Sequence, residues 1–302
     1  MRIKEIFSNA IWNTFKNFKF VILLWFTNAA LAFVIAVPVY ALLVDNLQHS
    51  ILSDKLAVEF DYLWFIQFMS IYKNTISHLP LLIYAIVGIY LIIQSFYLGG
   101  LISVYNNTEK NHISDFFYGG VKYFSRFIKV LLVSLFFIAI AFIVNDLIGE
   151  LIKYIFRDYD YQLTDFILRS LRYLLLILLI GIVFIISDYS RLVIAIKDSS
   201  KVFKSIYDSI IIIKNNFSQI FIIFLITSIM GAIGAIIYNI VEIFVPSEPY
   251  PFLILSFILQ QLLIIFRLLI RMLFVATEVI IYKDISADYF DSEINELKTG
   301  VN

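Results

Sequence analysis

The segment FVILLWFTNAALAFVIAVPVYALLV, which runs from Phe20 to Val44, contains 25 residues and no charged side chain. About 20 consecutive apolar residues are enough for a helix to cross the hydrocarbon core of a bilayer. The segment is also too long for the apolar part of a cleaved signal peptide, which has about 7–15 residues. It therefore predicts a transmembrane helix that is retained in the protein.

Five more segments of similar length and apolarity follow the first. They are Leu79–Tyr105, Val130–Ile148, Tyr173–Ile196, Asn215–Val241 and Phe252–Tyr282. The chain of 302 residues is 61% hydrophobic and 15% charged, whereas soluble domains are about 45–50% apolar and about 25% charged. The prediction is an all-α, polytopic membrane protein with six transmembrane helices. A single six-span domain is expected over 1–285, followed by a short acidic cytoplasmic tail over 286–302.

Lysine and arginine residues indicate which ends of the helices face the cytoplasm. Fifteen of them lie in the termini and in the loops on the same side, and six lie in the opposite loops. Because cytoplasmic loops carry an excess of Lys and Arg, both termini are predicted to be cytoplasmic, with the protein in the inner (cytoplasmic) membrane. The abundance of Ile, Phe, Tyr, Lys and Asn suggests an AT-rich microbial genome, and we expect a bacterial protein.

The composition excludes several kinds of chemistry. The chain has no cysteine, which removes disulfides and thiolate catalysis. Its formal net charge is zero, so no overall field favours nucleic acid as a partner. The histidines His49, His78 and His112 fall on both sides of the predicted membrane and do not form a metal site. No nucleotide-binding or nucleophile motif is present, so we predict no metal, no cofactor and no enzymatic activity.

An amphipathic segment precedes the first, third and fifth spans. The three segments end in similar motifs, Asn17-Phe18-Lys19, Tyr123-Phe124-Ser125 and Asn216-Phe217-Ser218. One interpretation is a threefold repeat of an interfacial helix that turns into a helical hairpin. The alternative is that any loop beside a membrane tends to be amphipathic. Basic side chains of the second and third segments are predicted to meet lipid headgroups: Lys122, Arg126, Lys129, Lys197, Lys201 and Lys204.

Four short motifs stand near the ends of the second, third and fourth spans. They are Tyr97-Leu98-Gly99-Gly100, Phe117-Tyr118-Gly119-Gly120, Tyr123-Phe124-Ser125-Arg126 and Asp188-Tyr189-Ser190-Arg191. With these motifs, residues 1–285 resemble a loose group of six-span bacterial and archaeal membrane families, which includes the membrane domain attached to some glycerophosphodiester phosphodiesterases. The catalytic half of those enzymes is missing. The resemblance therefore implies a six-helix membrane module and does not extend to the phosphodiesterase activity.

The sixth span carries polar side chains on one stripe. Gln260, Arg267, Arg271 and Glu278 lie within roughly 20° of a common line on a helix with about 100° per residue. Charged side chains within a span are costly unless they face protein or water. Counted from Phe252 at about 1.5 Å per residue, the two arginines lie about 22 and 28 Å into a core about 30 Å thick. They are therefore expected near the cytoplasmic boundary.

Two charged residues of the fourth span, Asp188 and Arg191, reach a similar depth. Together with the stripe they predict a polar cluster on the cytoplasmic side. Its members are Asp188, Arg191, Gln260, Arg267, Arg271 and Glu278. One interpretation is a cavity for an anion or a lipid headgroup, because arginine suits phosphate and carboxylate. The other is structural: the arginines reach the headgroups, and Asp188 pairs with Arg191 three residues further on.

Two other features predict shielding or packing. The charge-free run Tyr62–Tyr72 is too short to span a membrane and predicts an interfacial helix that shields the bundle or, alternatively, a lid over a cavity. In the fifth span, the small residues Thr227, Gly231 and Ala235 are spaced by four, which predicts close packing against another helix.

Three hypotheses for the function follow from these features. The leading one is a non-enzymatic, membrane-embedded module that binds membrane lipid or a protein partner. The alternative is a transporter or permease subunit that uses the cytoplasmic-side polar cluster as a cavity. An enzyme that acts on lipid comes third, and Asp188 with Glu278 is the carboxylate pair on which it would depend.

Overall fold

The structure is a computed structural model that describes residues 3–48, 50, 52–107, 113–156, 162–246 and 251–299. His49 and His112 lie outside the described residues, as do the last three residues of the acidic tail. All the regular elements in these ranges are helices, so the predicted all-α fold is confirmed. The helices are α1 (Ile3–Lys16), α2 (Lys19–Leu47), α3 (Leu52–Val58), α4 (Tyr62–Ile71), α5 (Lys73–Ile76), α6 (Leu79–Asn106), α7 (Ile113–Ile155), α8 (Gln162–Ile196), α9 (Val202–Asn215), α10 (Phe217–Ile243) and α11 (Pro251–Thr299).

The chain has six helical stretches that are long and apolar enough to cross a membrane. They are Lys19–Leu47, Lys73–Asn106, Ile113–Ile155, Leu163–Ile196, Phe217–Ile243 and Pro251–Ala287. Each contains most or all of one predicted span. The prediction of a six-span integral membrane protein is therefore confirmed. Helix α11 continues without a break through the start of the acidic tail to Thr299.

The helices form two compact units. Unit 1 comprises Met1–Ser8, Ser95–Phe224 and Val275–Asn302, and unit 2 comprises Asn9–Gln94 and Leu225–Phe274. Several helices, including α6 and α11, belong to unit 1 at one end and to unit 2 at the other.

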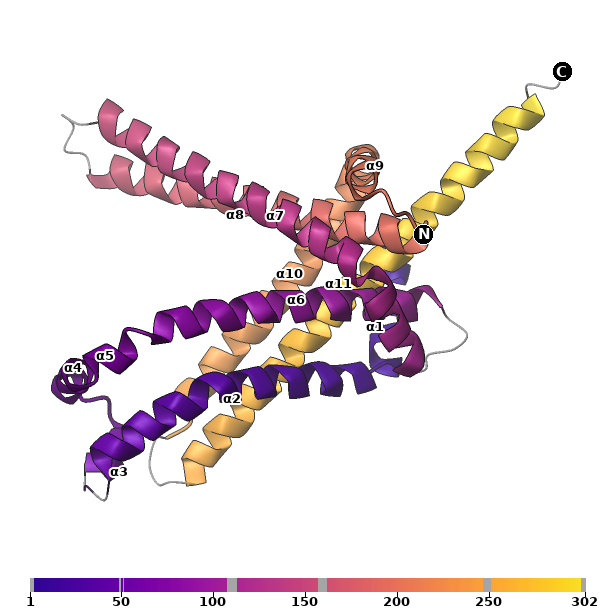
Figure 1. The fold of residues 1–302 in the computed structure, drawn as a ribbon. Helices are drawn as coiled ribbons and strands as arrows, with labels where there is room; N and C mark the ends of the chain where they lie inside the picture. The colour runs from indigo at the N-terminus through magenta and orange to yellow at the C-terminus, as the bar shows by residue number, and fades with distance from the viewer. Residues whose placement is uncertain are drawn as a thin grey trace. The chain divides into compact units, whose positions relative to one another are not determined.

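A long antiparallel hairpin of α7 and α8 forms the body of unit 1, and α9 packs against α8 (Figure 1). A hydrogen bond of 2.8 Å between the hydroxyls of Ser190 and Ser209 joins α8 to α9. The hydroxyl of Tyr123 in α7 donates to the carbonyl oxygen of Ala195 near the end of α8, at 3.0 Å. These polar contacts are buried, and they fix the ends of the three helices against one another.

Helices α6 and α7 touch through their backbones at two Gly-Gly pairs. A Cβ atom on Gly99 would lie 2.9 Å from the carbonyl oxygen of Gly119 and 3.3 Å from the Cα of Gly120. A Cβ atom on Gly100 would lie 2.6 Å from the ring of Phe116. Small residues permit such a close approach between helices in a membrane. The contact explains why glycine pairs stand at both positions, and it sets the register of α6 against α7.

In unit 2, the predicted short apolar helix is present as α4. The indole Nε1 of Trp64 donates to Oδ1 of Asn46 at 3.2 Å. The hydroxyl of Tyr72, directly after α4, donates to Oδ2 of Asp45 at 2.7 Å. These bonds tie α4 to the end of α2, and its role as an interfacial shield or as a lid stays a prediction.

Close packing between α10 and α11 in unit 2 centres on a glycine outside the predicted small-residue stripe. A Cβ atom on Gly234 would overlap the ring of Phe266. A Cβ atom on Gly231, which belongs to the predicted stripe, would meet Ile270 at 3.5 Å, an ordinary van der Waals distance. The fifth span therefore packs closely, but through the neighbouring glycine.

The amphipathic segments before the first and fifth spans are separate helices, whereas the one before the third span is not. Helices α1 and α9 end beside Asn17 and Asn216, whose side-chain Nδ2 atoms donate to the carbonyl oxygens of Asn13 at 2.8 Å and Ile212 at 3.1 Å. In α7 the matching position is Tyr123, which has no such amide, and the helix is continuous. The expected turn is thus absent from the second copy, and the threefold repeat stays a prediction.

Replacement of Gly99 by alanine should destabilise the protein, because the new Cβ meets the backbone of α7. Overpacking of this kind costs about 1–3 kcal/mol. The matched control is Gly88→Ala in the same helix, where nothing lies within 4 Å of the added Cβ. Thermal unfolding of the purified protein in detergent should show a lower midpoint for Gly99→Ala only. Equal midpoints for the two variants would contradict the glycine contact.

Candidate functional site

A polar cavity of about 240 Å³ lies in unit 1 between the end of α6 and the first turns of α7. Its polar lining consists of Ser103, Asn106, Asn107, Asp115, Tyr118, Lys122 and Tyr123. Ala195 of α8 closes another side. The lining thus combines one cation and one carboxylate with two amides and several hydroxyls. We call it the α6–α7 cavity. It suits a polar ligand that both donates and accepts hydrogen bonds.

Lys122 is held in a defined position on the wall of the α6–α7 cavity. Its Nζ lies 2.8 Å from the carboxylate of Asp198. The same Nζ lies 5.9 Å from the ring centroid of Tyr118 and 5.2 Å from that of Tyr123, within the range of a cation–π attraction. Because an ammonium group has three N–H donors, the ion pair leaves donors for a ligand in the cavity.

Asp198 links α7 to the turn between α8 and α9. Its backbone has a φ of 47°, in the left-handed region that Asp and Asn tolerate better than most residues. Arg126 Nη1 donates to Oδ1 of Asp198 at 2.8 Å and to the carbonyl oxygen of Ser199 at 3.2 Å. The hydrogen bonds from Lys122 and from Arg126 hold the pKa of the Asp198 carboxyl below its ordinary value. The acidic partner of these two basic residues was not predicted from the sequence.

Helix α11 supports the cavity from the α6 side. Lys283 Nζ donates to the carbonyl oxygen of Asn106 at 2.8 Å. The last carbonyl groups of a helix have no N–H partner within the helix, and this bond supplies a donor to one of them at the end of α6. It places a cation of α11 beside a residue that lines the cavity.

A buried charge cluster in unit 1 contains three of the six predicted cluster residues. Arg191 Nη1 donates to Oδ1 of Asp188 at 2.7 Å, so the predicted pair is present. Arg191 and Glu278 are each only 8% exposed. Glu278 interacts electrostatically with both Asp188 and Arg191. Asp188 and Arg191 thus form an ion pair, and the buried Glu278 lies near it without an ion pair of its own among the described residues, beside the fully buried ring of Tyr189.

The other three predicted residues belong to unit 2. Gln260 is exposed and shares a hydrogen bond with Tyr238. Arg271 Nη1 donates to the hydroxyl of Tyr90 at 3.4 Å. Arg267 is exposed and forms no ion pair with the described residues of its own unit. The stripe of the sixth span is thus divided between the two units, with Glu278 alone in unit 1.

The predicted headgroup residues fall into two groups. Lys122 and Arg126 are partly buried and are both paired with Asp198. Four others are exposed along α7, the α8–α9 turn and α9: Lys129, Lys197, Lys201 and Lys204. Lys122 is the one member of the set that lines the α6–α7 cavity.

No protein-family model, no curated protein and no solved structure matches this chain. The predicted resemblance to six-span membrane families stays a prediction. Two of its four motifs contain the Gly-Gly pairs, and these have a direct physical explanation in the contact between α6 and α7. The chemistry of the cavity follows from its own side chains.

Low pH should reduce the stability that the ion pairs of Asp198 with Lys122 and Arg126 contribute. The pKa of this carboxyl is lower in the folded protein than the value of about 3.9 expected in the unfolded chain. Its contribution to stability is therefore present above about pH 4 and is lost as the pH falls through the folded pKa. Asp198→Asn, which keeps the tolerance for the left-handed backbone, should lower the thermal midpoint at pH 6–7, and the difference from wild type should shrink toward pH 3.

The control for the Asp198 prediction is Lys129→Gln, an exposed change on α7 away from the ion pair. The midpoint of its thermal unfolding should equal that of wild type at every pH. A constant difference between Asp198→Asn and wild type from pH 7 to pH 3 would contradict the assigned role of the ion pair.

Proposed function

We propose that the protein is a non-enzymatic, membrane-embedded module that binds the headgroup of a membrane lipid in the α6–α7 cavity. The observation that supports this most directly is a polar cavity of about 240 Å³ in a protein with six long, apolar helical stretches. Such a role also fits the predicted relationship to six-span membrane modules.

The position of the α6–α7 cavity along its helices supports a lipid ligand. On α6 the lining residue Asn106 comes directly after the predicted span Leu79–Tyr105. On α7 the lining residues precede the predicted span Val130–Ile148. The cavity is therefore expected at the depth where hydrocarbon gives way to headgroups. Exposed apolar side chains, among them Val121 beside Lys122, give the same level of α7 a surface for acyl chains.

The side chains of the α6–α7 cavity favour a zwitterionic headgroup. Lys122 is positioned to meet a phosphate oxygen, since lysine is a common phosphate ligand. Asp115 supplies a carboxylate for an amine. The side-chain amides of Asn106 and Asn107 can both donate hydrogen bonds to a ligand and accept them from it. The lining contains one cation and one carboxylate, and a phosphoethanolamine headgroup carries one charge of each sign.

Transport is a second candidate, and the buried charge cluster supports it. Glu278 is 8% exposed within a helix long and apolar enough to span a membrane. No ion pair of Glu278 is present among the described residues. Ionisable residues buried among the helices of a membrane protein often mark ion or proton pathways. Under this hypothesis, Glu278 would be the residue that carries a proton or binds a cation.

Removal of the cavity cation should release bound lipid. Native mass spectrometry of wild type from membranes of phosphatidylethanolamine and phosphatidylglycerol should show retained phosphatidylethanolamine. Lys122→Met should reduce the retained fraction several-fold, because the phosphate loses its ligand. Lys129→Met removes an equal charge from the same helix outside the cavity and should leave retention unchanged. Absence of retained lipid in wild type, or equal loss in both variants, would argue against the proposed function.

The transport hypothesis predicts a flux that depends on Glu278. In proteoliposomes with an inside-negative potential, trapped pyranine should report proton entry above that of protein-free liposomes. Glu278→Gln should lower the rate several-fold, whereas Glu150→Gln, an exposed carboxylate at the far end of α7, should not. Wild-type rates equal to those of protein-free liposomes would remove this candidate.

A further inference from the structure

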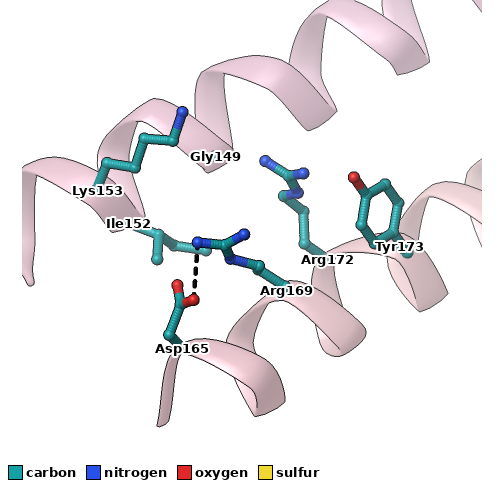
Figure 2. A pocket seen from close by; sticks show the side chains of 7 residues that line it. All are labelled: Gly149, Ile152, Lys153, Asp165, Arg169, Arg172 and Tyr173. Carbon is teal, nitrogen blue, oxygen red and sulfur yellow. Dashed lines mark ion pairs between the residues drawn. The ribbon is translucent and has the colours of Figure 1, made fainter. Parts of the chain in front are cut away.

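A second cavity lies at the opposite end of the α7–α8 hairpin. Its volume is about 140 Å³. Figure 2 shows Lys153 on one helix and Asp165, Arg169 and Arg172 on the other, around a common space. We call it the α7–α8 cavity. None of its residues belongs to the charge cluster or to the α6–α7 cavity.

The α7–α8 cavity has an excess of positive charge. Three basic side chains line it with one carboxylate. Arg169 Nη2 pairs with Oδ2 of Asp165 at 2.7 Å, which neutralises one of the three (Figure 2). Lys153 and Arg172 form no ion pair with any residue in the described part of the chain. Two cations are thus left to attract an anion.

Arg172 is held in place by packing. A Cβ atom at Gly149 would overlap Nη1 of Arg172, so the glycine provides the space that the guanidinium occupies. The guanidinium also lies 4.8 Å from the ring centroid of Tyr173. Its Nε is buried and has no hydrogen-bond partner among the described residues. A guanidinium that is positioned by a ring and a glycine keeps its N–H donors for a ligand.

The distance along α7 places the α7–α8 cavity at the level of headgroups. From Lys122 to Lys153 there are 31 residues of continuous helix, which at about 1.5 Å per residue is about 46 Å. A bilayer with its headgroup regions is about 40–45 Å thick. Exposed apolar residues near this end of the hairpin, Tyr154, Leu163 and Phe166, suit contact with lipid.

We propose that the α7–α8 cavity binds the phosphate of an anionic lipid headgroup, in the leaflet opposite to the α6–α7 cavity. The guanidinium groups of Arg172 and Arg169 would donate to phosphate oxygens, and Lys153 would add its charge from α7. The proposal does not depend on the function proposed for the α6–α7 cavity.

Thermal unfolding in an uncharged maltoside detergent tests the proposal with two probes, short-chain dihexanoylphosphatidylglycerol and inorganic phosphate. The test variant is Lys153→Gln with Arg169→Gln, because both side chains are exposed and the fold should survive. Arg172→Gln is a second variant. The control, Lys197→Gln with Lys214→Gln, removes the same charge from exposed positions elsewhere.

Phosphatidylglycerol should raise the midpoint of wild type and of the control. The shift should fall at least threefold in the Lys153/Arg169 variant and in Arg172→Gln. A shift with phosphatidylglycerol alone supports a lipid headgroup as the ligand, and an equal shift with inorganic phosphate would overturn that assignment in favour of a free anion. Equal responses of wild type and the Lys153/Arg169 variant, or no response to either probe, would overturn the proposal. Lys122→Met should keep the shift, so failure of one cavity is distinguishable from failure of the other.

Discussion

The backbone contact between Gly99-Gly100 and Gly119-Gly120 determines how α6 packs against α7 in unit 1. It brings α6 and α7 together where a side chain larger than hydrogen does not fit. Polar side chains on both sides of the contact, from Ser103 to Asn107 at the end of α6 and from Asp115 to Tyr123 on α7, line the α6–α7 cavity. The close backbone contact and the polar cavity therefore both result from the way in which α6 packs against α7.

Charged residues of unit 1 form two groups, one near the surface and one buried. Lys122 and Arg126 meet Asp198 near the surface, where their ion pairs connect α7 to the α8–α9 turn. Elsewhere in the same unit, Arg191 pairs with Asp188, and the buried carboxyl of Glu278 lies near this pair. Burying an ion pair away from water costs desolvation free energy, which is offset only when the geometry of the pair is good. The contact at Asp198 therefore holds Lys122 in place on the wall of the α6–α7 cavity, and the transport hypothesis depends on the buried cluster.

Much of this architecture was predictable from the sequence, because apolar length decides whether a helix can span a bilayer. All six predicted spans are present, and the pairing of Asp188 with Arg191 follows from their spacing along one helix. The continuity of α7 was not predicted, since it depends on Tyr123 in place of an asparagine that accompanies the breaks elsewhere. The role of Asp198 was also missed, because its partners lie far away in sequence. The periodicity of apolar residues indicates the faces of a single helix, whereas a cavity depends on how several helices pack, which the sequence does not indicate directly.

The proposed function depends on a lipid headgroup in the α6–α7 cavity. The most direct test is an experimental structure of the protein in a nanodisc of phosphatidylethanolamine and phosphatidylglycerol. The account predicts headgroup density in the cavity, with a phosphate within hydrogen-bond distance of Lys122 and at the phosphate level of the surrounding bilayer. A cavity that contains only water, or one that lies well outside the headgroup layer, would contradict it.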